Sequence, residues 1–301
     1  MLDRILRDPH FSRNADREAP WLSEQIISIA AADPDFAVEV YRCIYGQMIT
    51  DTATSALGGS QSRILPLSSN RRQDYEHSRW QLGKSISKFL EISPEYGTRA
   101  IIDAVIGRAA TEGYGAPDEP LVIDLGATQV EFRGHKIEFN AWDEKGEGAV
   151  GREDDVLSSF VAFLRGCDAD AFSSSVAAAS RDYATASVWT RILGVASERI
   201  GEVDDIVWPL TARPDLLENT DTLRDAVRFV AASFPSRTAD EKERFERMVL
   251  DDTRHRDKER RKRWRRILGR LLTLIPEEEL VLDATRALRR QMEKNSELEE
   301  N

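Results

Sequence analysis

Apolar residues recur at helical spacing along most of the chain, and part of this pattern is repeated. When the sequence is shifted by 60 residues, two segments align without a gap. Three apolar pairs coincide in this alignment: Leu22 with Leu82, Ile26 with Ile86, and Ile29 with Phe89. Their spacings of four and three residues place each set on one helical face. A weaker third copy, at a shift of 135 residues, contains Leu157, Val161, Leu164, Asp168 and Phe172.

A helix-start signal follows the apolar residues in both of the stronger copies. The residues Asp33-Pro34-Asp35-Phe36 coincide with Ser93-Pro94-Glu95-Tyr96. Asp33 or Ser93 can accept a backbone N–H of the next helix, and the proline that follows needs no N–H at the first helical position. Each copy is therefore predicted to be a helix, a capped turn and a second helix. Because a single pair cannot bury its apolar stripe, we expect the pairs to stack.

Two segments interrupt the helical pattern. Residues 51–69 are rich in Gly, Ser and Thr, which predicts an extended loop between repeats. The second interruption, 113–151, contains strand-like runs at 121–124, 129–132 and 135–139, which predict a small hairpin or a three-stranded meander.

Beyond Gly151 the pattern is again helical, with prolines at 209, 214, 235 and 276 as breaks. The predicted helices are 153–166, 169–180, 184–200, 220–234, 238–251, 255–275 and 277–297. The sequence therefore predicts an all-α fold, a continuous α-solenoid of stacked helical pairs with a small β-hairpin insertion. Its parts are helical repeats at 1–112, the insertion at 113–151, and further repeats at 152–301.

Paired helices with such capped turns resemble the HEAT and armadillo α-solenoids. A more particular resemblance lies in the segment from Ser62 to Tyr75, followed by a helix and Ser93-Pro94-Glu95. It looks like part of the helical-repeat sensor region of large bacterial STAND-type NTPases, and it covers roughly positions 15 to 110. The resemblance implies a role in defence against phage, with a phage protein or the rest of a defence complex as partner. It also implies that the chain is a separate polypeptide or a fragment of a longer protein.

Nucleotide and metal chemistry is not expected in this chain. Gly83-Lys84-Ser85 matches the end of a P-loop, but Ser78 stands where the first glycine belongs, within a helical pattern. The run 146–152 lacks the Lys-Ser/Thr pair that would hold phosphate and magnesium. The four histidines (His10, His77, His135 and His255) have no metal-ligand spacing. We therefore expect no cofactor, no metal site and no catalytic residue.

Composition narrows the class of protein further. The 301 residues carry a formal net charge of −11, which argues against general coating of nucleic acid. The two cysteines, Cys43 and Cys167, belong to no CxxC motif, so a reduced cytoplasmic chain is expected. No stretch approaches the ~18 consecutive apolar residues of a membrane span. We expect no membrane partner.

One segment reverses the average charge. Residues 254–270 contain ten Lys or Arg against two acids, a local charge of +8. Trp264, Ile267, Leu268, Leu271 and Ile275 fall on one face, so a basic amphipathic helix is predicted over 254–275. Its cations could bind an acidic protein or nucleic acid. They could also pair internally, either with acids at 240, 241, 243 and 246 or with the Glu-rich tail at 297–300. The candidate partner-binding residues here are Arg260, Arg261 and Arg263.

A second candidate binding surface is the 51–69 loop and the helix start that follows it. The residues proposed to contact a partner are Arg63, Arg71, Arg72 and Tyr75, since loops on a rigid scaffold often carry binding specificity. The alternative is a solvated loop in which Arg71 and Arg72 simply begin a helix.

A metal-dependent nuclease is a third possibility. Asp118, Asp124 and Glu131 lie on or beside strand-like runs, where two carboxylates could hold Mg²⁺. Against it, Arg133 stands where the PD-(D/E)xK pattern requires Lys, and the insertion is too short for the flanking core. The leading hypothesis is thus a non-enzymatic helical scaffold for protein recognition, with a nucleic-acid-binding scaffold as the alternative.

Overall fold

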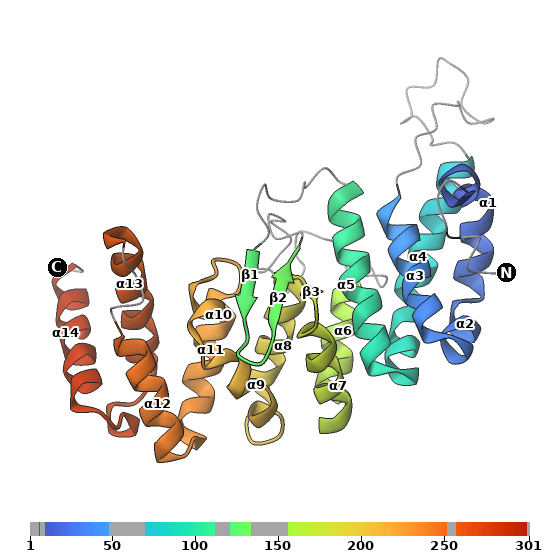
Figure 1. The fold of residues 1–301 in the computed structure, drawn as a ribbon. Coiled ribbons are helices and arrows are strands. Elements are labelled where there is room, and N and C mark those ends of the chain that lie inside the picture. Colours follow the sequence, from blue (N-terminus) through green and yellow to red (C-terminus); the bar gives the residue numbers. More distant parts are fainter. Residues whose placement is uncertain are drawn as a thin grey trace. The chain divides into compact units, whose positions relative to one another are not determined.

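The computed structural model describes residues 6, 10–47, 70–111, 121–133, 156–251 and 257–299, and the side chains of 12, 70, 71 and 295–299 lie outside this description. These residues form 14 helices and one three-stranded sheet, so the described chain is mainly α-helical, as predicted (Figure 1). The predicted loop at 51–69 and the predicted strand at 135–139 lie outside the described residues. None of the helices that the structure describes is long and apolar enough to cross a membrane.

The chain divides into two compact units. Unit 1 comprises Met1–Pro120 and Arg133–Ala179, and unit 2 comprises Leu121–Phe132 and Ser180–Asn301. The hairpin that was expected to be a separate insertion therefore belongs with the C-terminal helices. The first helical pair of the predicted C-terminal repeats belongs with the N-terminal ones.

Unit 1 is built of helical pairs. Its helices are α1 (His10–Glu24), α2 (Ile26–Ala32), α3 (Pro34–Gly46), α4 (Asn70–Ile92), α5 (Pro94–Thr111), α6 (Val156–Gly166) and α7 (Ala169–Ala179). Helix α5 contacts α3 and α7, while α4 contacts α1 and α6 (Figure 1). Neighbouring pairs therefore pack first helix against first helix and second against second.

The predicted capped turn is present in the first and third copies of the repeated sequence. The Asp33 carboxylate accepts the N–H of Phe36 at 3.0 Å, and Pro34 occupies the first turn of α3. In the third copy, Asp168 accepts the N–H of Ala171 at 2.8 Å. The apolar triplets of the first two copies are buried, which confirms their predicted faces: Leu22, Ile26, Ile29, Leu82, Ile86 and Phe89.

The third copy matches the prediction at Leu164, but its first two buried positions lie one residue earlier than predicted. Val156, Phe160 and Leu164 are buried on α6, whereas the predicted Leu157 and Val161 are only half-buried. Phe160 and Leu164 are four residues apart, whereas Ile26 and Ile29 are three apart, so the extra residue lies within the helix and one shift cannot align all the buried positions.

The C-terminal end of α3 is tied to α4. The Tyr75 hydroxyl donates to the carbonyl of Ile44 at 2.7 Å, and Arg79 Nε donates to the same carbonyl at 3.1 Å. An Arg79 guanidinium nitrogen also donates to the carbonyl of Gln47 at 2.5 Å. The Arg79 guanidinium and the Tyr75 hydroxyl thus donate hydrogen bonds to backbone carbonyls at the end of α3, where a helix leaves carbonyls without intrahelical partners.

Unit 2 begins with a small sheet. Strands β1 (Leu121–Asp124) and β2 (Gln129–Phe132) form the predicted antiparallel hairpin, with Val122 opposite Glu131. Strand β3 (Tyr183–Ala184) adds to β2 in parallel. Residue 184 was expected to begin a helix, but a strand pairing across about 50 residues has no local signal. The edge of β1 is partly covered, because Asp215 accepts the N–H of Asp124 at 2.7 Å.

The remainder of unit 2 is helical. Its elements are α8 (Ala186–Glu198), α9 (Asp204–Thr211), α10 (Pro214–Glu218), α11 (Leu223–Ser233), η2 (Phe234–Ser236), α12 (Ala239–Leu250), α13 (Lys258–Leu274), η4 (Glu277–Glu279) and α14 (Asp283–Glu299). Helices α9 and α10 lie where no helix was predicted. Pro209 was expected to interrupt helical structure but lies inside α9. The predicted helix 277–297 is divided into η4 and α14.

A buried carboxylate joins α12 to the start of α14. Glu246 has no exposed surface, and its two oxygens accept the N–H groups of Val281 at 2.6 Å and Leu282 at 2.7 Å. The Thr285 hydroxyl also donates to this carboxylate. Glu246 therefore provides an N-terminal cap for α14 from a different helix.

Candidate partner-binding face of helix α13

Helix α13 begins at Lys258 because Asp257 caps it. The Asp257 carboxylate accepts the N–H of Arg260 at 3.1 Å and that of Glu259 at 3.4 Å. The predicted apolar face is confirmed, since all five of its residues are at most 4% exposed: Trp264, Ile267, Leu268, Leu271 and Ile275. The Trp264 indole N–H donates to the carbonyl of Val249 at 3.3 Å, which fixes α13 against the end of α12.

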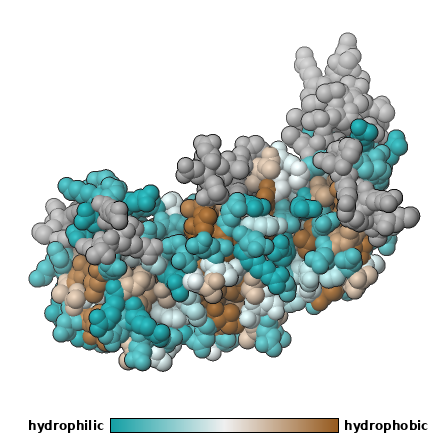
Figure 2. Space-filling model, viewed as in Figure 1, coloured by the Kyte–Doolittle hydropathy of each residue, from teal (hydrophilic) through white to brown (hydrophobic). Residues whose placement is uncertain are grey.

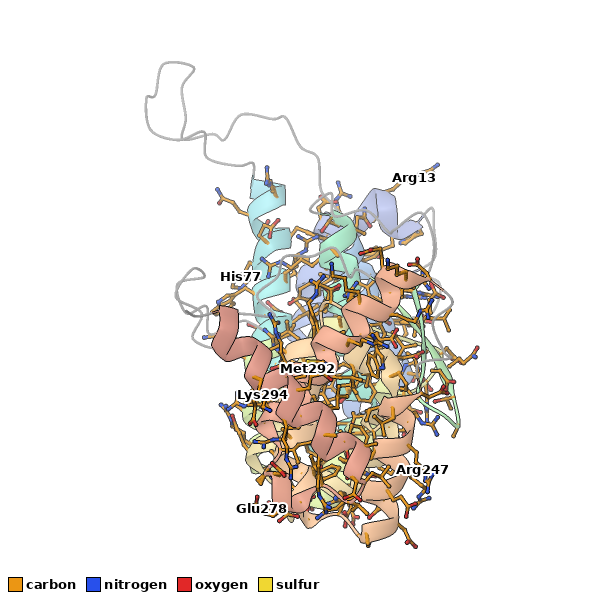
Figure 3. The ribbon with its side chains drawn as sticks, turned by 90° about the vertical axis from the view of Figure 1, so that its left-hand side faces the viewer. Arg13, His77, Arg247, Glu278, Met292 and Lys294 are labelled. Atoms are coloured by element: carbon orange, nitrogen blue, oxygen red, sulfur yellow. The ribbon has the colours of Figure 1, made fainter. Side chains whose placement is uncertain are left out.

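Helix α14 covers one side of α13. A Cβ atom on Gly269 would lie 3.2 Å from the sulfur of Met292, so the two helices approach closely at this glycine. Arg289 donates to the carbonyl of Leu272 at 3.1 Å and places a cation at the C-terminal end of α13. Figure 3 shows Met292 on α14, with Lys294 two residues closer to the C-terminus on the same helix.

Three cations of α13 are exposed to solvent on the side away from its buried apolar face. Lys262, Arg266 and Arg270 are exposed and stand four residues apart, so they form a line along the helix. We call these three residues the cationic stripe. Within the described part of the chain, none of the three side chains forms an ion pair or a hydrogen bond. Figure 2 shows mostly hydrophilic residues over the C-terminal helices.

The acids expected to neutralise this helix are engaged elsewhere. Glu243 accepts from Arg247 at 2.5 Å, and Glu246 caps α14. Glu241 accepts from the Thr238 hydroxyl at 2.7 Å, and this hydrogen bond lowers the pKa of the Glu241 carboxyl. Three of the four predicted internal partners therefore have other roles. The tail at 297–300 lies outside the described side chains.

The predicted anchors on α13 divide into two groups. Arg260 is exposed and forms no side-chain contact with a described polar group. Arg263 donates to the carbonyl of Glu218 at 3.1 Å and to the Thr220 hydroxyl at 2.8 Å, which joins α13 to the end of α10. Arg261 is also exposed but takes part in interactions within the protein. Arg261 and Arg263 therefore have structural contacts of their own.

The second predicted surface differs from the expectation. Arg63 lies outside the described residues, as does the side chain of Arg71, and Arg72 is exposed at the start of α4. Tyr75 is only 1% exposed, and burial raises the pKa of its phenol well above the usual value. The prediction that Tyr75 is a surface anchor was wrong, because its ring packs in the interior of unit 1 and its hydroxyl donates to a carbonyl near the end of α3.

The carboxylates of the proposed nuclease do not form a metal centre in the described structure. Asp124 accepts the N–H of Gly126 at 2.6 Å and so shapes the turn of the hairpin, where Gly126 has a φ of +92°. Glu131 is also engaged in an interaction within the protein. Across the described residues no group of three His, Cys, Asp or Glu side chains could hold a metal ion, and Asp118 lies outside them.

The cationic stripe was missed at the sequence level, although the signal was present. Trp264 and Leu268 were correctly placed on the buried face, and a helix turns 100° per residue. Lys262, Arg266 and Arg270 therefore had to point away from that face.

Comparisons of the chain with family models, curated proteins and solved structures find no match.

Proposed function

We propose that this protein is a non-enzymatic helical scaffold that binds an acidic partner protein through the cationic stripe of α13. The observation that carries the proposal is that Lys262, Arg266 and Arg270 are exposed in one line without a described internal partner. Exposed charges that are not paired within a chain are available to steer and orient an oppositely charged partner. The pairwise packing of helices in unit 1 supports the further proposal of a HEAT- or armadillo-like scaffold.

Nucleic acid is the second candidate, because Arg and Lys also bind phosphates. A stripe of three cations would give a logarithmic salt dependence with a slope of about −3, which is shallow for a duplex-binding protein. The net charge of −11 would also repel a long polyanion. A short acidic segment of a protein meets less of this repulsion, so we favour a protein partner. A sensor role in phage defence rests only on the sequence resemblance over roughly positions 15 to 110.

The test is affinity capture from nuclease-treated native lysate, followed by quantitative mass spectrometry. Three chains are compared: the unaltered protein, the variant Lys262→Glu/Arg266→Glu/Arg270→Glu, and the control Arg13→Glu/Arg17→Glu/Lys88→Glu. The control residues are exposed on unit 1 and make no described side-chain interaction, and the control changes the net charge equally. We expect the stripe variant alone to lose specific proteins. Equal recovery by all three chains would refute the proposal.

A further inference from the structure

The line of the cationic stripe continues onto an exposed leucine. Leu274 stands four residues after Arg270, at the last position of α13, so it is the next member of this i, i+4 row, which winds about 40° around the helix axis at each step. It is 59% exposed, the largest exposed fraction among the large apolar side chains of the described residues. The face therefore runs from three cations to an apolar end.

A single exposed leucine is common on protein surfaces and needs no explanation by itself. The position of Leu274 matters because it is in register with cations that have no described internal partner. At 1.5 Å per residue, Lys262 and Leu274 are about 18 Å apart along the helix. A ligand that follows the whole line needs anionic groups over about two turns and an apolar group beyond them.

We propose that the partner segment bound by α13 is an acidic peptide with a large apolar side chain at one end, which packs on Leu274. This inference rests on the proposed function and specifies the chemistry of the partner. Three carboxylates match the charges of Lys262, Arg266 and Arg270, and the apolar residue removes the Leu274 side chain from water. A phosphate backbone has no apolar group to place there, so the leucine favours a peptide over a nucleic acid.

An apolar contact at Leu274 would add to the small binding energy that exposed ion pairs provide. Each exposed ion pair contributes little, because water and salt screen it. Burial of a half-exposed leucine against another apolar group adds an interaction that salt does not weaken. We therefore expect the charges to orient the segment and the leucine to reduce its dissociation.

The test is a fluorescence-anisotropy titration with labelled 13-residue peptides. One peptide carries Glu at positions 1, 5 and 9 and Leu at position 13, in a background of Ala and Gln, and a second peptide has the same residues in reverse order. Matched peptides have Ala in place of Leu. The protein variants are Leu274→Ala, Leu274→Met, the stripe variant and the control with changes at Arg13, Arg17 and Lys88.

We expect the better of the two Leu peptides to bind the unaltered protein roughly three- to tenfold more tightly than its Ala counterpart. Leu274→Ala should remove that difference without weakening the Ala peptide, and Leu274→Met should retain it. If the Leu and Ala peptides bind equally while the stripe variant loses both, the inference about Leu274 is wrong and the proposed function stands. If the stripe variant binds every peptide as well as the control does, the proposed function itself fails.

Discussion

Replacement of Glu246 by alanine should release the start of α14 from α12. The Glu246 carboxylate is fully buried and accepts two backbone N–H groups, from Val281 at 2.6 Å and Leu282 at 2.7 Å. Without it these donors would have no partner, while the Thr285 hydroxyl could still donate to the carbonyl of Leu282 at 2.7 Å. The perturbation is therefore confined mainly to two partly buried backbone donors.

The expected cost follows from those two donors. A buried polar group left without a partner costs about 1–3 kcal/mol, so these two partly buried donors together should cost roughly 3 kcal/mol. Glu246→Gln keeps one acceptor oxygen but places an amide N–H₂ against the other donor, and it should cost about 1–2 kcal/mol. The matched control is Glu243→Ala on the same helix. It removes an exposed i,i+4 pair with Arg247 and should cost about 0.3–0.5 kcal/mol.

Native-state hydrogen exchange measured by mass spectrometry can follow this change in α14 alone. A loss of about 3 kcal/mol corresponds to about 150-fold faster exchange of the α14 amides when exchange reports local opening. Amides of unit 1 serve as the internal reference and should keep their rates. If Glu246→Ala changes exchange in α14 no more than Glu243→Ala does, the capping argument is wrong.

Three further changes test the packing of the two units. Gly107→Ala should destabilise unit 1 by about 1–3 kcal/mol in chemical denaturation, because the new Cβ would lie 2.7 Å from the backbone nitrogen of Gly46. The control Gly46→Ala should be neutral, because its Cβ would lie 4.0 Å from the nearest atom. Arg237→Met should cost unit 2 about 3 kcal/mol by leaving the buried Asp204 carboxylate without its cation, and added Asp204→Asn should recover part of this loss in thermal melts. Burial raises the folded-state pKa of Tyr75 above the unfolded value of 10.0, so its contribution to stability is present below pH 10 and falls as the pH rises above it. Tyr75→Phe should weaken this alkaline dependence, and an unchanged pH profile of circular dichroism would contradict the assignment.

The local parts of unit 1 were predictable because short-range chemistry determines them. The Asp33 cap, the adjacent Pro34 and the spacing of Leu22 and Ile26 all act within one turn or two, and the structure confirms them. The third copy shows the limit of this reasoning. One extra residue between Phe160 and Leu164 moves the first buried position from Leu157 to Val156, and only packing against neighbouring helices decides that phase.

Long-range contacts account for what the sequence could not show. The sequence predicted Tyr75 to be an exposed anchor beside a loop, yet its ring is buried and its hydroxyl donates to the carbonyl of Ile44 on another helix. Strand β3 exists because Tyr183 lies beside Glu131 in the folded chain. For α13 the information was present: the buried positions were correct, and the exposed cations follow from the helical period. Which of the remaining cations were engaged, such as Arg263 with Glu218, required the structure.

Hydrogen exchange of the protein with and without its captured partner tests the central claim most directly. If α13 is the binding face, the partner should slow exchange in residues 258–274, and the stripe variant should show no such protection. The control variant with changes at Arg13, Arg17 and Lys88 should behave like the unaltered protein. Protection elsewhere with none over α13, or equal protection in the stripe variant, would contradict the proposed function.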